Sequence, residues 1–163
     1  LIVVSQLQNH QALETETILR SGWRVWFPVN HRLAVEEKIE ATELAQQSLI
    51  LLQVDELGDA TTALWNAGGV DPTVLIRTSS VEAVRSLVAT GAGCSVLPDM
   101  LYRPWSLEGD RIEARPLAHT LPHLEVGLAW RKGAVLPESL SNFLTAVRPT
   151  LEGHVLGGGT LIR

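Results

Sequence analysis

The stretch TSSVEAVRSLVATGAGCSVLP, residues 78–98, predicts a helix that leads directly into a buried strand. Ser79 and Glu82 have the spacing of a capping box, which satisfies the free N–H groups at the start of a helix. Gly91 is placed to end the helix, and Cys94–Leu97 then forms a short apolar strand that stops before a proline. The apolar residues of the helix recur on one face, namely Val81, Val84, Leu87 and Val88. The stretch is therefore typical of one helix–strand unit of an α/β fold.

Strand and helix signals alternate on both sides of this stretch. Apolar or alternating runs bounded by turn residues predict strands at Leu1–Ser5, Thr15–Arg20, Trp23–Val29, Ser48–Gln53, Thr73–Arg77, Arg111–Pro116 and Leu124–Trp130. Helices are predicted over Glu43–Gln47 with Thr42 as the cap, from an Asp59 cap to Gly68-Gly69, and over Pro137–Val147. This alternation favours a mainly parallel sheet covered by helices, with ligands bound beyond the carboxyl ends of the strands.

The composition is that of a globular protein with one domain or two small lobes: 163 residues, 45% of them hydrophobic and 19% charged. The formal net charge is -5 and the basic residues are scattered, so this stretch by itself should bind nucleic acid poorly. No apolar run is as long as a membrane-spanning helix requires, and the first residues lack the pattern of a signal peptide. We therefore expect no membrane partner and a cytoplasmic location.

Signatures of catalysis, metal binding and cofactor binding are absent from the sequence. The single cysteine, Cys94, excludes a disulfide framework or a multi-cysteine metal site, and it heads a strand where a packed thiol is favoured over a redox sensor. His119 and His123 have the spacing of a helical zinc site, but the proline between them argues against a helix. The glycine-rich segment 91–93 follows a helix and precedes a strand, whereas a phosphate loop follows a strand and precedes a helix. We therefore predict no catalytic residue, no metal site and no cofactor.

Two predicted helix entries carry candidate ligand-binding groups. At a helix entry, free N–H groups, hydroxyl groups and the positive end of the helix dipole come together, which suits a carboxylate or another small anion. The alternative is that Ser79 only caps its own helix, and both interpretations stay open. The candidate side chains are those of Gln53, Asp59 and Thr61 at one entry and Thr78, Ser79 and Ser80 at the other.

Residues 78–98 also resemble the best-known stretch of LysR-type effector-binding domains. In that family a helix started by Ser or Thr runs into Leu-Val-Ala-x-Gly-x-Gly, and then into a buried strand ending in Leu-Pro. Arg32 and Ser48 depart from the family's pattern, because it usually has proline there, and Glu43 stands where it has aspartate. Further landmarks follow in the family's order: Leu1–Ser5, Phe27–Ala34, Leu44–Ile50, Ala67–Pro72 and Leu128–Gly133. The order and spacing of these landmarks over residues 1–150, taken together, make the resemblance to this family specific.

The resemblance implies an α/β fold with two lobes, like a type 2 periplasmic binding protein, with mainly parallel sheets and an incomplete first lobe. The two strands that cross between the lobes would lie near Glu16–Ser21 and Leu124–Trp130. The expected parts are an effector-binding domain over residues 1–150, comprising the second lobe (22–123) and a remnant of the first (1–15 and 131–150), and a flexible glycine-rich tail (151–163).

By the same resemblance the protein is a sensing domain of a bacterial transcription regulator and not an enzyme. A small, anionic effector would bind between the lobes, at Ser5 on the first and at the two helix entries on the second. The other implied partners are further copies of the chain, as a homodimer or homotetramer, and DNA only through a helix-turn-helix domain expected ahead of Leu1. The alternative is a solute-binding protein of a transport system, which shares the two lobes and would need an export signal.

Overall fold

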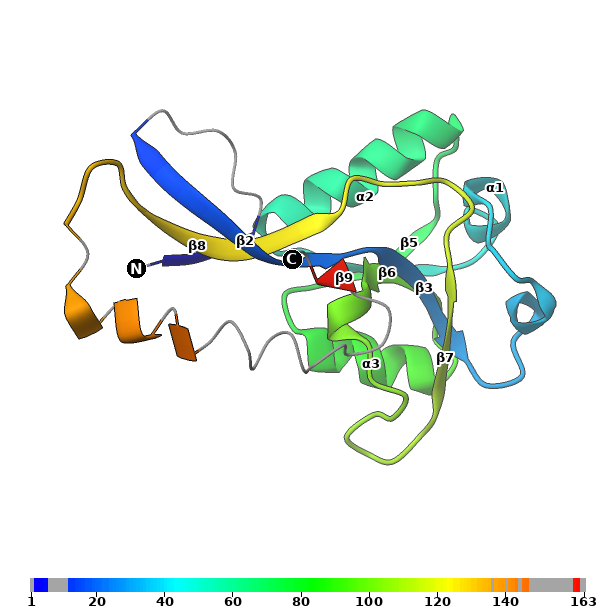
Figure 1. The fold of residues 1–163 in the computed structure, drawn as a ribbon. Helices are drawn as coiled ribbons and strands as arrows, with labels where there is room; N and C mark the ends of the chain where they lie inside the picture. The colour runs from blue at the N-terminus through cyan, green and yellow to red at the C-terminus, as the bar shows by residue number, and fades with distance from the viewer. Residues whose placement is uncertain are drawn as a thin grey trace. The chain divides into compact units, whose positions relative to one another are not determined.

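A computed structural model describes residues 2–5, 12–135, 137–139, 141–143, 145–146 and 160–161 of the chain. The chain divides into two compact units (Figure 1). Unit 1 comprises residues 1–22 and 123–163, and unit 2 comprises residues 23–122. The chain leaves unit 1 through strand β2 (Leu13–Ser21) and returns to it through strand β8 (Leu124–Arg131). The two units are described separately below.

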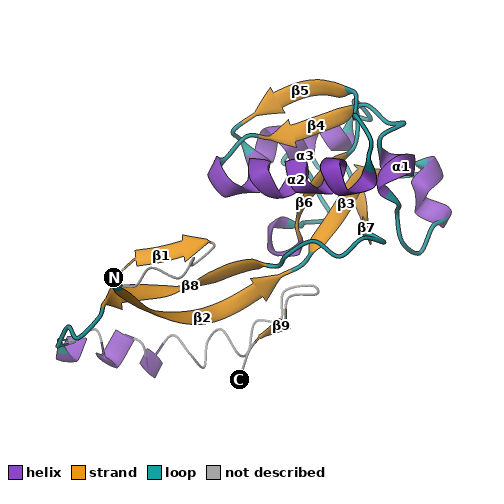
Figure 2. Ribbon diagram, turned by 90° about the horizontal axis from the view of Figure 1, so that it is seen from above, coloured by secondary structure: helices purple, strands orange, loops and turns teal. Residues whose placement is uncertain are grey.

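Unit 1 contains a four-stranded sheet in the order β1-β8-β2-β9, with β1 at Ile2–Ser5 and β9 at Thr160–Leu161 (Figure 2). Every neighbouring pair in it is antiparallel. The expectation of mainly parallel sheets is therefore wrong for this unit. The physical reason lies in the connectivity, because the chain departs along β2 and comes back along β8, so these two paired strands must run in opposite directions.

Side-chain contacts reinforce the β2–β8 pair. The guanidinium Nε of Arg20 lies 2.7 Å from a carboxylate oxygen of Glu125, and the Trp130 indole donates to Glu14 at 2.9 Å. Of the predicted flexible tail, 151–163, only Thr160–Leu161 is described, and it pairs with β2. Within the predicted helix Pro137–Val147, residues 138–139, 141–143 and 145–146 are helical and Pro137 is not, and the others lie outside the described residues.

Unit 2 contains a three-stranded antiparallel sheet in the order β6-β3-β7 and a parallel pair β4-β5. The strand bounds are β3 Trp23–Pro28, β4 Leu49–Leu52, β5 Val74–Thr78, β6 Ser95–Pro98 and β7 Ile112–Pro116. Cys94, the residue before β6, connects the three-stranded sheet to the β4-β5 pair. Its N–H donates to Ser48 O at 2.9 Å, and its carbonyl oxygen accepts from the Ile50 N–H at 2.8 Å. The parallel expectation thus holds for β4 and β5, and it is wrong for β3 and its neighbours.

The helices of unit 2 are α1 (Ala41–Leu44), α2 (Asp55–Gly68) and α3 (Val81–Ala89), and 3-10 turns lie at Arg32–Val35 and Asp99–Leu101. Three predicted starts are wrong. Thr42 does not cap α1, which begins at Ala41 after Glu40. Asp59 does not cap α2, which begins four residues earlier at Asp55, after Val54. The cap of α3 is Ser80 and not Ser79. Propensity alone does not choose among consecutive polar residues, and the end of the preceding strand decides where each helix begins.

Two hydrophobic clusters cover the opposite faces of the unit 2 strands, and β3 contributes alternate residues to each. Val25 and Phe27 face the cluster that includes Leu64 and Trp65 of α2. Trp26, between them in sequence, faces the cluster that includes Val84 and Val88 of α3. Successive side chains of a strand point to opposite faces, so α2 and α3 lie on opposite sides of these strands, as Figure 1 shows. This is the layered α/β arrangement that the helix periodicity predicts.

Candidate functional site

The entry of α3 brings together four of the predicted site residues at the carboxyl ends of β4 and β5. The Gln53 N–H donates to Thr78 O at 2.7 Å, which holds the two strand ends side by side. The Ser80 hydroxyl oxygen accepts from the Ala83 N–H at 3.2 Å, and the Thr78 hydroxyl oxygen accepts from the Ser80 N–H at 3.2 Å. Ser79 and Ser80 are exposed and Thr78 is half-buried. The hydroxyl groups at this entry are therefore accessible from solvent.

The three hydroxyl groups are not equivalent. Those of Thr78 and Ser80 are engaged in capping the local backbone. The Ser79 hydroxyl forms no hydrogen bond with another described residue, so it is the one of the three that is available to a ligand without disturbing the helix. The interpretation of Ser79 as merely a cap is thus wrong, because Ser80 has that role.

The remaining predicted residues lie elsewhere or outside the description. The side chains of Ser5, in β1, and of Asp59, in the interior of α2, lie outside the described residues. Thr61 is buried on α2, where its hydroxyl donates to Leu57 O at 3.2 Å. Because α2 begins at Asp55, Thr61 lies more than one turn inside the helix and not at its entry.

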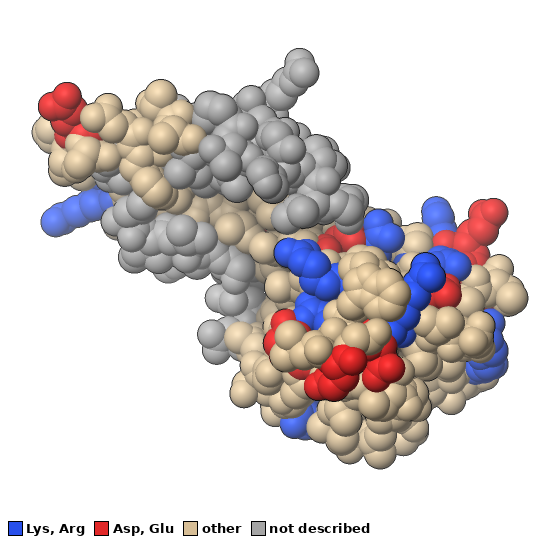
Figure 3. Space-filling view, turned by 90° about the horizontal axis from the view of Figure 1, so that it is seen from below, with Lys and Arg blue, Asp and Glu red and all other residues tan. Residues whose placement is uncertain are grey.

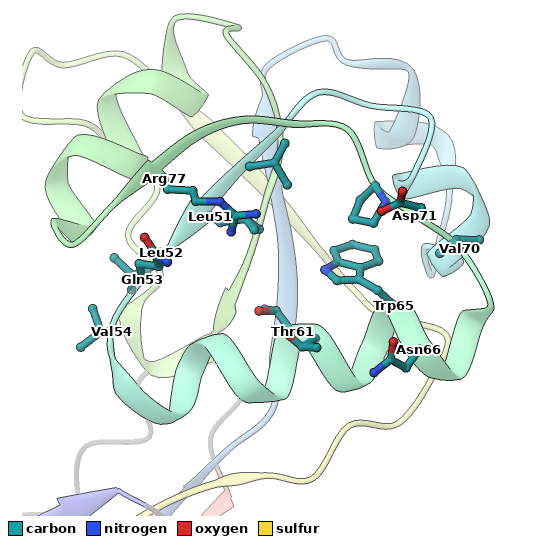
Figure 4. A pocket seen from close by; sticks show the side chains of 13 residues that line it. Leu51, Leu52, Gln53, Val54, Thr61, Trp65, Asn66, Val70, Asp71 and Arg77 are labelled. Carbon is teal, nitrogen blue, oxygen red and sulfur yellow. The ribbon is translucent and has the colours of Figure 1, made fainter.

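A cavity of about 710 Å³ lies between α2 and the β4-β5 pair (Figure 4). Gln53 and Thr61 line it, whereas Thr78, Ser79 and Ser80 do not. Its lining also includes Trp65, Asp71 and Arg77, which were not predicted as site residues. Arg77 could have been identified from the sequence, since a cation on an otherwise apolar strand is unusual. Trp65 could not, because the sequence places it only on an apolar helix face.

Trp65 has a buried polar group without a partner. Its side chain is only 7% exposed, and its indole Nε1 has no hydrogen-bond acceptor among the described residues. Trp23 is equally buried, but its Nε1 donates to the Pro122 carbonyl at 2.8 Å. A buried donor that lacks an acceptor costs about 1–3 kcal/mol of stability. The described part of the chain therefore leaves the Trp65 indole N–H without an acceptor.

This difference gives a stability prediction. Trp65→Phe removes an unpaired N–H together with some apolar surface, so it is expected to change the free energy of unfolding by less than about 1 kcal/mol. Trp23→Phe leaves the Pro122 carbonyl without its donor and is expected to cost about 1–2 kcal/mol. Urea denaturation of both variants measures the difference. Equal losses in the two variants would mean that the Trp65 indole N–H is satisfied in solution.

The only cysteine lies in an environment that suppresses the thiolate. Cys94 is 1% exposed, and burial raises the pKa of its thiol to about 11, although the positive charge of Arg32 acts in the opposite direction. Its sulfur lies 3.9 Å from Nε2 of His31, whose pKa is lowered, first by burial and then by Arg32. The neighbouring imidazole is therefore mainly neutral and does not provide the cation that would stabilise a thiolate.

The described residues give no sign of a nucleic-acid surface (Figure 3), a metal site or a membrane-spanning helix. On the face drawn in Figure 3, acidic and basic side chains of unit 2 stand next to one another, without a continuous basic surface. Within the described ranges, no group of three or more His, Cys, Asp or Glu residues could hold a metal ion. None of the described helices is long and apolar enough to cross a membrane.

Comparison with known proteins identifies relatives over nearly the whole chain. The family model described as "LysR substrate binding domain" matches residues 1–152. The hydrogen peroxide-inducible genes activator of Escherichia coli O157:H7 is 27% identical over 126 residues, which are 77% of this chain and 41% of that protein. The chain thus spans less than half the length of this relative.

Solved structures show the same fold. The LysR family transcriptional regulator HinK from Pseudomonas aeruginosa matches with a TM-score of 0.81 and 23% identity, over 91% of this chain and 52% of that one. The effector-binding domain of QuiR, solved in complex with shikimate, matches with a TM-score of 0.72 and 19% identity, over 93% of this chain and 71% of that one. The two-lobed fold predicted from the sequence is the fold of these domains.

Proposed function

This chain belongs to the LysR substrate-binding domain family, and on that premise we propose that it is the effector-sensing part of a LysR-type transcriptional regulator that acts in the cytoplasm without catalysing a reaction. The match over residues 1–152 is the observation that supports this function. It also favours a regulator over a solute-binding protein of a transport system. The proposed partners are a small anionic effector, further copies of the chain as a homodimer or homotetramer, and DNA through a helix-turn-helix domain of the same regulator.

The effector is proposed to bind at the α3 entry. The exposed Ser79 hydroxyl, the N–H groups of the first helical turn and the positive end of the helix dipole together favour an anionic oxygen. Gln53 is exposed at the neighbouring strand end and is held there by its backbone bond to Thr78. Ser5, Asp59 and Thr61 remain proposed effector residues. The first two have side chains outside the described residues, and Thr61 is buried on α2, where it lines the neighbouring cavity and not the α3 entry.

Binding would act on transcription by changing the balance between arrangements of the regulator. An effector can shift such a balance only by the difference between its affinities for the two arrangements. An effector that preferred one arrangement tenfold would shift the balance tenfold, which corresponds to about 1.4 kcal/mol. A site formed at a helix entry suits this role, because its N–H donors are fixed by the backbone and their position follows the movement of the whole helix.

A second candidate function, peroxide sensing, is suggested by the name of the hydrogen peroxide-inducible relative. A cysteine that reacts with peroxide must be accessible and form a thiolate easily. Cys94 is buried and its thiol pKa is about 11, and the sequence has no other cysteine that could form a disulfide with it. Peroxide sensing by a cysteine of this chain is therefore disfavoured.

Ser79→Ala tests the effector site. The variant is expected to keep the melting temperature of the unliganded protein and to lose most of the upward shift that binding of a small organic acid produces, because it removes a hydroxyl without removing the helix cap. Ser80→Ala is a less clean test, since loss of a cap lowers stability by about 1 kcal/mol. A panel of organic acids and their amides, followed by thermal denaturation, identifies the class of ligand.

Ser48→Ala is the matched control, because Ser48 is an exposed serine that lies immediately before β4, at the opposite end of that strand from the α3 entry. It should retain the full ligand-induced shift. If Ser79→Ala also retains the full shift for an acid that stabilises the unmodified protein, the α3 entry is not where the effector binds.

A further inference from the structure

We propose that the cavity between α2 and the β4-β5 pair is a second small-molecule site, which binds a compact organic monocarboxylate with an apolar body. All of its lining residues belong to unit 2, and none of Thr78, Ser79 and Ser80 is among them. The cavity therefore shares Gln53 and Thr61 with the proposed effector residues, but the three hydroxyl-bearing residues of the α3 entry lie outside it. Its volume of about 710 Å³ lies in the range of small-molecule pockets, roughly 300–1,000 Å³.

The Trp65 indole supplies the first specific feature of this cavity. Its Nε1 is buried and has no acceptor among the described residues, and in Figure 4 the nitrogen edge of the ring is turned toward the interior of the cavity. Trp26 also has an unpartnered Nε1, but it does not line the cavity, and the guanidinium of Arg85 lies over its ring at 5.5 Å. A ligand can therefore supply the acceptor that Trp65 lacks among the described residues.

Arg77 supplies the second feature, a cation at the same cavity. It lies on β5, is exposed, and forms no ion pair or side-chain hydrogen bond with any residue in the described ranges. In Figure 4 its guanidinium extends over the cavity from the side opposite Trp65. A guanidinium pairs with a carboxylate through two parallel N–H donors, so a free arginine beside an apolar wall favours an organic acid over a neutral ligand.

The rest of the lining limits what the acid can look like. Leu51 and Val74 are half-buried apolar residues, and with the Trp65 ring they form walls suited to a flat or compact hydrocarbon body. Asp71 also lines the cavity, and Figure 4 places it at the end away from Arg77. A second carboxylate at that end would lie near the Asp71 carboxylate and be repelled. The site therefore selects one acidic group, at the Arg77 end.

Benzoate is a suitable probe, because it combines one carboxylate with a flat apolar ring. The 15N-labelled chain gives indole N–H signals from its five tryptophans, and Trp65→Phe assigns the signal of Trp65 by its disappearance. Titration with benzoate is expected to shift this signal in a saturable manner. Arg77→Gln should weaken binding by roughly tenfold or more. Lys38→Gln removes the same charge from an exposed position outside the cavity and should leave the affinity unchanged.

Two further ligands test the selection. Benzyl alcohol lacks the charge and terephthalate adds a second carboxylate, and both should bind more weakly than benzoate. Asp71→Asn should restore binding of terephthalate without improving that of benzyl alcohol. The proposal is overturned if millimolar benzoate leaves the Trp65 signal unmoved, or if Arg77→Gln and Lys38→Gln weaken binding equally. Ser79→Ala should not affect the benzoate titration, so a failure here is distinguishable from a failure of the effector site at the α3 entry.

Discussion

Gly93→Ala is expected to destabilise the protein by about 3 kcal/mol or more, a large effect for the addition of one methyl group. A Cβ built on Gly93 would lie 2.4 Å from the carbonyl oxygen of Ser48 and 3.1 Å from its carbonyl carbon. Both are backbone atoms, so no side chain can rotate away. The same Ser48 carbonyl accepts the Cys94 N–H at 2.9 Å, so relieving the clash would separate the start of β6 from β4.

Gly22→Ala is the matched control, since a Cβ at Gly22 would meet nothing within 4 Å and its backbone has no positive φ. It is expected to change the free energy of unfolding by less than about 0.5 kcal/mol. Urea denaturation of the two variants measures both values, and the midpoint for Gly93→Ala should fall far below that for Gly22→Ala. Similar midpoints would contradict the close approach of Gly93 to Ser48.

Cys94 is expected to react with a thiol reagent about a hundredfold more slowly in the folded protein than after unfolding, at pH 8. The thiolate is the reacting species, and a rise of the pKa from 9.0 to about 11 lowers the thiolate fraction by about two powers of ten. Burial of the sulfur adds a steric barrier to this electrostatic one. The rate of reaction with an aromatic disulfide, measured with and without urea, gives the ratio.

The same shift has a consequence for stability at high pH. Because burial raises the thiol pKa, the folded state favours the neutral thiol. The corresponding stability is fully present below about pH 9 and is lost as the pH rises through about 11. Cys94→Ala should lose less stability than the unmodified protein across this window, when both are followed by urea denaturation. Rapid reaction of the native thiol at pH 8, or an equal loss in both proteins, would exclude the raised pKa.

Local features of the fold were predictable because they depend on neighbouring residues. The apolar periodicity from Val81 to Val88 identified α3, whose face is buried as expected. Gly91 was expected to end this helix, and it has a φ of 82° directly after the C-cap Thr90. Gly69, with a φ of 61°, ends α2 in the same way. A residue that must adopt a positive φ is recognisable from its type and its place in the pattern.

The candidate site was predictable only in part. Thr78, Ser79 and Ser80 were identified because a hydroxyl run before a helix has a local meaning, and Gln53 because it follows a strand. Which hydroxyl caps the helix was not decided locally, and the structure assigns the cap to Ser80. Likewise, Asp59 was predicted at a helix entry, but it lies in the interior of α2 because that helix begins at Asp55.

The sequence by itself therefore determined which segments are helices and strands, where glycine is required to end a helix, and which family the chain resembles. Only the tertiary structure decided that β2 and β8 pair in opposite directions. It also decided that the Arg77 guanidinium and the Trp65 indole, neither of which has a side-chain partner in the described part of the chain, line one cavity. The physical reason is range. Helix periodicity and capping depend on residues within a few positions of one another, whereas strand direction and cavities depend on which distant segments pack together.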